Sequence, residues 1–201
     1  MRLGLVGQLT YQVNLVAMAG IPQKHDPGGK VRLAVPPDAK SFAVFGGPNK
    51  CYRYQLRRTW DKTKPHIMFI MMNPSRADVT EDDRTVAKCY RFAKTWGVYG
   101  GIYVGNTFAY RATDKKDLRV IPDPVGPKND EHLIAMAKLA EKVIFAYGQP
   151  GHKSLQDRGQ RVGKMLIGTG VKPYVLKLSK DRTPCHPLYL RKTCEPVPWK
   201  L

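Results

Sequence analysis

The sequence predicts an α/β protein: a three-layer sandwich in which helices cover both faces of a central, mostly parallel, four-stranded sheet. Two observations lead to this fold class. Short apolar runs, as expected of buried strands, alternate along the chain with longer segments whose apolar residues recur at helical spacing. Strands that alternate with helices in this way form parallel sheets in three-layer proteins. A length of 201 residues, of which 42% are hydrophobic, is sufficient for one such core.

Four segments are expected to form the parallel sheet, at residues 67–72, 101–104, 142–146 and 172–178. The first of them is an uninterrupted apolar run, which is typical of a strand that is buried on both faces. Glycine follows the second and the third closely and marks the end of each strand.

Three helices are expected around these strands: one at residues 80–96, one that begins near Pro127, and one at about 154–168. In the first, the apolar side chains fall on one helical face. Thr80 and Asp83 have the spacing of a capping box, which predicts that this helix starts at Thr80.

The N-terminal part of the chain has a different character. We expect residues 1–30 to form a mobile arm, followed by a single domain of residues 31–201. Frequent Gly and Pro around this boundary favour loops with short strands at 31–35 and 41–45. Residues 51–58 then alternate apolar and basic side chains, which predicts a half-exposed strand with one arginine face.

The charge balance points to a polyanionic partner. Lys and Arg number 34 against 16 Asp and Glu, which gives a formal net charge of +18 at pH 7. The surplus is concentrated in residues 51–100 and 151–201. A surplus of this size is typical of proteins that bind nucleic acid.

We expect a cytoplasmic protein, by default a monomer, that needs neither a metal nor a cofactor. Residues 3–19 are apolar, but polar side chains interrupt the run, so it is a poor export signal. No other segment approaches the length of a membrane span. The cysteines form no C-x-x-C pair, which favours free thiols over a zinc or iron–sulfur site. They are Cys51, Cys89, Cys185 and Cys194.

Polar side chains stand at the ends of three predicted strands. Asn73 begins an Asn-Pro-Ser segment after the first strand, Asn106 follows the second, and His186 begins a His-Pro segment after the fourth. Each segment alone is typical of a turn or a packed loop. However, ligands of parallel sheets bind beyond the carboxyl ends of the strands. We therefore expect Asn73, Asn106 and His186 to face a common cleft.

These segments resemble the motifs of the uracil-DNA glycosylase superfamily over about residues 65–192. In its mismatch-specific branch the Asn of an Asn-Pro motif positions the attacking water, which is the role the resemblance implies for Asn73. A later strand-end Asn reads the Watson–Crick edge of the flipped base, which corresponds to Asn106. A His-Pro motif supplies a histidine that donates to the base O2, which corresponds to His186. Residues 40–64 are similar to a bacterial and phage relative that carries an Arg-Tyr-x-Leu-x-Arg strand.

The resemblance implies a uracil-DNA glycosylase-like fold and a hydrolase, a monofunctional DNA glycosylase. Such an enzyme flips a pyrimidine out of DNA and leaves an abasic site, in repair or in defence against phage DNA. Ser75 stands where the family has Gly or a Tyr that excludes thymine, and Leu188 stands where it has Ser. Ser75 therefore leads us to expect a pocket that admits C5-modified pyrimidines. Base contacts are expected from Met72, Pro74, Ser75 and Asn106, and DNA contacts from Arg76, Arg111, Lys128, Tyr189 and Arg191.

Other classes remain open at this point. A nucleic-acid-binding module that kept the fold without the chemistry is one alternative, because an asparagine is a weak catalyst. A phosphoryl-transfer enzyme is disfavoured because no phosphate-binding glycine motif occurs. A serine or cysteine hydrolase lacks the G-x-S-x-G elbow, and the adjacent Cys185 and His186 point apart. The acidic stretch at Asp82 and Asp83 either lines the mouth of the cleft or serves a helix N-terminus.

Overall fold

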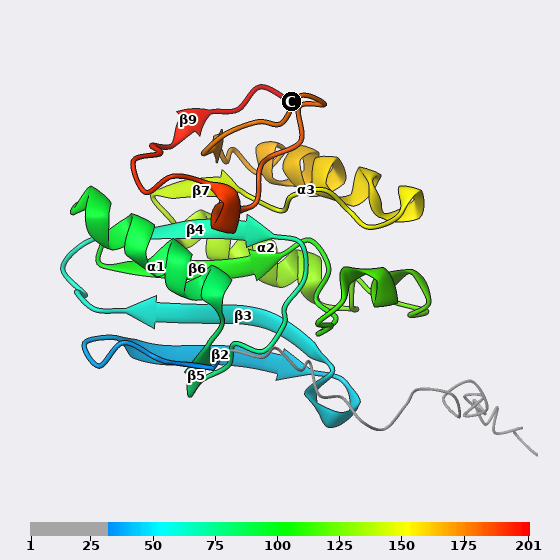
Figure 1. The fold of residues 1–201 in the computed structure, drawn as a ribbon, viewed down its shortest axis with the longest axis horizontal. Coiled ribbons are helices and arrows are strands. Elements are labelled where there is room, and N and C mark those ends of the chain that lie inside the picture. The colour runs from blue at the N-terminus through cyan, green and yellow to red at the C-terminus, as the bar shows by residue number, and fades with distance from the viewer. Residues whose placement is uncertain (1–31) are drawn as a thin grey trace, which may run out of the picture.

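The computed structural model describes residues 32–201, so the expected arm at residues 1–30 lies outside the described residues. Within the described part, the chain forms an α/β fold around a seven-stranded mixed sheet (Figure 1). In chain order the strands are β2 (Lys40–Gly46), β3 (Tyr52–Thr59), β4 (His66–Met71), β6 (Gly101–Asn106), β7 (Lys142–Phe145), β8 (Pro173–Val175) and β9 (Val197–Pro198). Their order across the sheet is β2-β3-β6-β4-β7-β8-β9.

The centre of the sheet is parallel and its edges are antiparallel. Strands β6, β4, β7 and β8 run parallel to one another and are the four expected strands. Strands β2 and β3 add an antiparallel pair at one edge, and β9 adds an antiparallel strand at the other. The expectation of four strands is therefore wrong for the sheet as a whole. Periodicity identifies β2 and β3 as strands but not the edge that they join, and β9 is too short to show a pattern.

Helices cover both faces of the sheet (Figure 1). Helix α1 (Arg84–Trp96) packs on one face, and α2 (Asn129–Leu139) and α3 (Asp157–Ile167) pack on the other. Side chains of the central strands divide accordingly: Phe69 belongs to the cluster under α1, and its neighbour Met68 to the cluster under α2 and α3. The three-layer arrangement is therefore confirmed, with a core on each side of the sheet.

Helix α1 begins at Arg84, later than expected. Its N-cap is Asp83, whose carboxylate accepts hydrogen bonds from two backbone N–H groups of the first turn. The preceding residues form strand β5 (Glu81–Asp82), which pairs with β1 (Leu33–Ala34) outside the main sheet. The expectation that Thr80 starts the helix is wrong, because residues 81–82 form a strand that pairs with β1 instead of a helical turn.

Strand β3 contributes two buried arginines that tie it to the loop before α1. Arg58 is 0% exposed, pairs with Asp82 at 2.6 Å and donates to two backbone carbonyls of that loop. Arg53 is 2% exposed and donates to the carbonyl of Ala77 at 2.6 Å. The expectation of an arginine face exposed to solvent is wrong for Arg53. Backbone carbonyls of a distant loop accept hydrogen bonds from both guanidinium groups inside the protein instead.

The remaining elements lie close to their expected places. The helix expected near Pro127 begins at Asn129, and a short 3-10 helix, η4 (Lys153–Leu155), precedes α3. All four cysteines are free. Between residues 32 and 201, no helix combines the length and the apolar character needed to cross a membrane.

Candidate functional site

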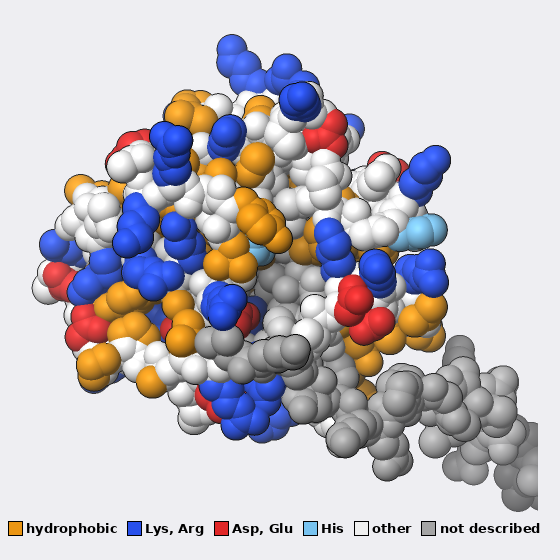
Figure 2. Space-filling view, in the orientation of Figure 1, with side chains coloured by type: hydrophobic (Ala, Val, Ile, Leu, Met, Phe, Trp, Pro, Cys, Tyr) orange, Lys and Arg blue, Asp and Glu red, His pale blue; other side chains and the backbone are white. Residues whose placement is uncertain are grey.

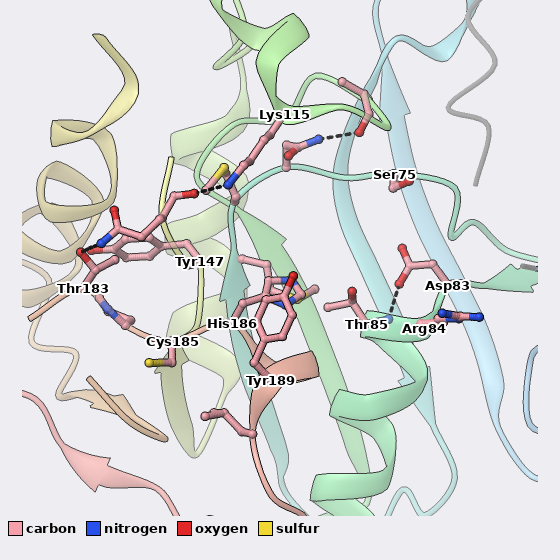
Figure 3. A pocket seen from close by; sticks show the side chains of 18 of the residues that line it. Ser75, Asp83, Arg84, Thr85, Lys115, Tyr147, Thr183, Cys185, His186 and Tyr189 are labelled. Carbon is pink, nitrogen blue, oxygen red and sulfur yellow. Dashed lines mark hydrogen bonds between the residues drawn. The ribbon is translucent and has the colours of Figure 1, made fainter. Parts of the chain in front are cut away.

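A cavity of about 1090 Å³ opens beyond the carboxyl ends of the parallel strands (Figure 3). Its walls come from the segments after β4, β6, β7 and β8, from the start of α1, and from the 3-10 helix η5 (Pro187–Tyr189). In this view Lys115 and Tyr147 lie on one side, Asp83 and Arg84 on the other, and His186 between them. The cavity occupies the sheet edge at which open α/β proteins bind ligands.

Asn73 lines the cavity directly after β4. Its side-chain Nδ2 donates to the backbone carbonyls of Ala112, at 2.7 Å, and of Pro74, at 3.1 Å. Because both partners are acceptors, the amide orientation is defined and both N–H groups are occupied. The Oδ1 atom is therefore the polar atom that Asn73 offers to a ligand or a water.

His186 lines the same cavity from the segment after β8, where it is the N-cap of η5. Its Nδ1 accepts a hydrogen bond from the backbone N–H of Leu188 at 3.4 Å, so the neutral ring carries its proton on Nε2. Burial lowers the pKa of His186 below 6.5, the Asp83 carboxylate opposes this shift, and Lys115 adds to it. The imidazole is therefore a neutral Nε2–H donor at pH 7.

The imidazole of His186 has close neighbours on two sides. Gly148 has φ +68°, and a Cβ built there would lie 3.1 Å from the Cβ of His186. Tyr189 stands at the mouth with 86% of its surface exposed, its ring centroid 5.8 Å from that of His186. Tyr147 lines the inner wall, and burial raises its pKa to about 12, so its hydroxyl stays protonated. One tyrosine is available to stack on a ligand, and the other offers a neutral hydroxyl.

Asn106 ends β6 but does not line the cavity, and it is 1% exposed. Its Oδ1 accepts a hydrogen bond from Nη2 of Arg53 at 3.2 Å, and Arg53 lines the cavity instead. The expectation of a common cleft is therefore confirmed for Asn73 and His186 and wrong for Asn106. The physical reason is the buried guanidinium, which binds the asparagine amide from the neighbouring strand.

The other residues expected to contact the base divide in a similar way. Met72 and Ser75 line the cavity. Pro74 is buried and does not line it, and its carbonyl accepts hydrogen bonds from Asn73 and from the backbone N–H of Ala112. Pro74 therefore supports the wall of the cavity through its backbone.

The residues expected to contact DNA are dispersed over the surface. Tyr189 stands at the cavity mouth, and the exposed Arg191 follows one of the lining residues directly. Lys128 is exposed at the start of α2. Arg76 pairs with a glutamate at 3.7 Å, and Arg111 lies over a phenylalanine ring at 5.2 Å. Tyr189 is thus the one of these residues that lines the cavity.

Several charged residues line the cavity that the sequence pattern did not place there, and for one of them it left two roles open. Asp83 both caps α1 and lines the cavity, so the two interpretations of that stretch hold together. Lys115 and Lys177 line it as well, and Lys115 donates to a backbone carbonyl at 2.7 Å. Their signal is their position in polar loops after parallel strands. Arg53 carries no such signal, because the strand pattern places it on an exposed face.

Comparison with known proteins gives one match. A protein-family model described as a protein of unknown function, DUF1643, matches residues 53–188. No curated protein and no solved structure matches the chain. Within residues 32–201, no three His, Cys, Asp or Glu side chains are grouped so that they could hold a metal ion. The matched segment runs from β3 to η5 and includes both Asn73 and His186. Because it spans more than half of the chain, the protein belongs to the DUF1643 family.

Proposed function

We propose that this protein is a DNA glycosylase with a uracil-DNA glycosylase-like fold, which hydrolyses the N-glycosidic bond of a flipped pyrimidine. The observation that carries the proposal is the pair Asn73 and His186, which are far apart in the sequence but line one cavity. Their free atoms are complementary: Asn73 offers the acceptor Oδ1, and His186 offers the donor Nε2–H. Hydrolysis of a glycosidic bond requires an acceptor that orients water and a donor that stabilises the departing base.

In the proposed reaction the bond between C1′ of the sugar and the base nitrogen breaks, and its electron pair moves into the base. Negative charge develops on the base, and positive charge develops on the sugar. The Nε2–H of His186 donates to a carbonyl oxygen of the base, and a preorganised donor of this kind contributes about 3–4 kcal/mol. The Oδ1 of Asn73 accepts a hydrogen bond from the attacking water and orients it toward C1′.

Asp83 supplies the group that can take up the proton of this water. An amide oxygen is too weak a base for that step, whereas a carboxylate is suited to it. One carboxylate oxygen of Asp83 is held by the backbone N–H groups of Thr85 and Val86, so the side chain is fixed at the cavity wall. Its negative charge also stabilises the positive charge that develops on the sugar.

The size of the cavity and the side chain at position 75 favour a modified base. A volume of about 1090 Å³ lies just above the range of about 300–1,000 Å³ that is usual for pockets of drug-sized molecules, and it exceeds the need of an unmodified pyrimidine ring. Ser75 lines the cavity with a small side chain that leaves space beside the ring. Pyrimidines with bulky C5 substituents are therefore the proposed substrates.

The surface around the mouth supports DNA as the partner. Arg84 lines the cavity at the start of α1, and Lys88 and Arg91 follow along the same helix. Arg191 and Lys192 extend from η5, which packs against α1. Figure 2 shows Lys and Arg side chains gathered over α1 on this face of the molecule. Basic side chains in this position would contact the phosphates that flank a flipped nucleotide.

The test is release of base from defined oligonucleotides, single- and double-stranded. The set carries uracil, mismatched thymine, 5-hydroxymethylcytosine or glucosylated 5-hydroxymethylcytosine, and abasic sites are detected by alkaline cleavage. Mass spectrometry identifies each released base. We expect release of at least one modified pyrimidine. A protein that binds these oligonucleotides and produces no abasic site from any of them is a binding module, and the proposal is then wrong.

Three variants connect the activity to the cavity. His186→Ala is expected to lower the rate about 10²- to 10³-fold, because it removes the donor to the departing base. Asn73→Ala is expected to slow the reaction by orienting the water poorly. His152→Ala is the matched control, since His152 is exposed and does not line the cavity. Equal rates for His186→Ala and His152→Ala would show that the imidazole of His186 has no part in the reaction.

A further inference from the structure

Arg53 is a buried cation whose described partners are all neutral. Its side chain lines the cavity with 2% of its surface exposed. Nη1 donates to the carbonyl of Ala77 at 2.6 Å, and Nη2 donates to Oδ1 of Asn106 at 3.2 Å. Nε has no hydrogen-bond partner, and no carboxylate among residues 32–201 forms an ion pair with this guanidinium.

The nearby carboxylates are engaged elsewhere. Asp82 pairs with Arg58 at 2.6 Å, and Asp83 accepts hydrogen bonds from the first turn of α1. Burial lowers the pKa of Arg53 to about 10, so the group is still charged at neutral pH. The cavity wall therefore contains a full positive charge that no residue of the described chain neutralises by direct contact.

Asn106 adds a second unsatisfied donor beside this charge. Because Nη2 of Arg53 must face an acceptor, Oδ1 of Asn106 points to it, and Nδ2 is left with no partner. An unpaired buried charge is strongly unfavourable unless a ligand supplies what is missing, and Arg53, unlike Asn106, lines the cavity where a ligand can do so. The missing element at this wall is negative charge.

We propose that the Arg53 guanidinium is the counter-ion for negative charge on a planar heterocycle held in the cavity, namely the base that departs in the proposed reaction. The inference rests on that proposed function and adds an electrostatic element to it. His186 is neutral and donates a hydrogen bond, so it cannot supply the opposite charge, whereas Arg53 can. In the low-dielectric wall of a cavity, a fixed cation stabilises developing charge without reorganisation.

The C1′–N bond breaks, and its electron pair enters the ring of the base. Water adds through oxygen to C1′, and its proton passes to the Asp83 carboxylate. His186 donates its Nε2–H to a ring carbonyl oxygen, and Arg53 keeps all of its protons while it faces the anion. The base leaves as an anion and takes up a proton from solvent, and Asp83 releases the proton that it accepted to solvent.

The first test is independent of DNA and of catalysis. 5-Nitrouracil has an acidic ring N–H, and its absorbance changes when it ionises, so its titration can be followed with the protein bound. An opposite charge nearby is expected to lower its apparent pKa by about 1 to 3. Arg53→Met should abolish this shift, and Arg53→Lys should retain part of it. Arg57→Met is the matched control from the same strand, because the Arg57 side chain lies over two aromatic rings and does not line the cavity.

The second test uses the leaving group. Fluorine at C5 stabilises the ring anion, so 5-fluorouracil in DNA needs less help from a cation than uracil does. If Arg53 faces the departing base, Arg53→Met should slow single-turnover release of uracil about 100-fold and release of 5-fluorouracil clearly less. A purely structural role would slow both equally. Thermal unfolding of each variant, with Arg53→Lys as the conservative replacement, shows whether the fold is kept.

The outcomes separate the inference from the proposed function. Base release that Arg53→Met leaves unchanged, together with an unshifted nitrouracil titration, overturns the inference and leaves the glycosylase intact. An Arg53-dependent shift of the nitrouracil pKa without base release from any oligonucleotide supports the anion site and contradicts the proposed glycosylase function. An equal shift in Arg53→Met and in the native protein shows that other cations hold the anion, and this also overturns the inference.

Discussion

Replacement of Arg58 by Met tests how the protein holds the loop that carries the start of α1. Arg58 is 0% exposed and donates to Asp82 at 2.6 and 3.1 Å, to Oγ of Ser41 at 2.7 Å and to the carbonyl of Asp78 at 2.6 Å. Methionine fills much of the same space but replaces none of these bonds. The substitution therefore leaves the Asp82 carboxylate, which is also 0% exposed, without its counter-ion.

The expected cost is large compared with the stability of a domain. Breaking a buried ion pair by removing one partner costs about 3–5 kcal/mol, and a typical domain is stable by about 5–15 kcal/mol. Urea unfolding followed by tryptophan fluorescence measures this cost. The double variant Arg58→Met/Asp82→Leu removes both charges and should recover most of the loss, because two apolar side chains need no partner. Together with Asp82→Leu alone, it completes a double-mutant cycle.

The dependence on pH gives an independent check. Burial raises the pKa of Asp82 even with Arg58 beside it. Such a group stabilises the fold in its protonated form, and that contribution is lost as the pH rises through its folded-state pKa. Without Arg58 the pKa rises further, so the cost of Arg58→Met should shrink as the pH falls from 7 toward 4. A cost below about 1 kcal/mol at pH 7, the range of a surface pair, or a double variant no more stable than Arg58→Met, would refute the reasoning.

Three further predictions concern the cavity and its surroundings. Arg91→Gln on α1 should reduce the slope of log binding constant against log salt by about 0.9 for each phosphate that the protein no longer neutralises, whereas Lys138→Gln on α2 should leave it unchanged in the same anisotropy titration. Gly148 has φ +68°, and the Cβ that Gly148→Ala adds would lie 3.1 Å from the Cβ of His186. The substitution should therefore cost about 1–2 kcal/mol and slow base release about tenfold by displacing the imidazole; an unchanged rate contradicts that effect. In an NMR titration His186 should ionise below 6.5, because burial lowers its pKa. The free energy of unfolding should then fall as the pH drops below 6.5, since only the unfolded state takes up the proton there; ionisation above 6.5 contradicts the assigned burial.

The local pattern of apolar and polar residues was sufficient to predict most of the architecture. The apolar run at residues 67–72 predicts a strand buried on both faces, and in the structure Ile67 to Ile70 are 0% exposed. The alternation of strands and helices predicts three layers and one edge for the site, where Asn73 and His186 line the cavity. These features were readable because burial on a strand or a helix imposes a period on neighbouring residues.

Other features depend on partners distant in the sequence. The strand pattern places Arg53 on a solvent face, yet the loop at Ala77 and the amide of Asn106 enclose it. Nothing near Asn106 in the sequence indicates that an arginine will occupy its oxygen. The start of α1 differs from the expected one for the same reason, because Glu81–Asp82 pair with β1 as a strand.

The four parallel strands, the two helical layers and the edge that holds the cavity follow from the amino-acid sequence, because each is set by the local spacing of apolar and polar residues. Which polar side chains reach the cavity, and which charge stays there without a partner, is decided by the tertiary structure alone. The reason is physical: a buried polar group is placed by the hydrogen bonds and ion pairs that it finds, and these partners come from segments whose proximity exists only in the folded chain.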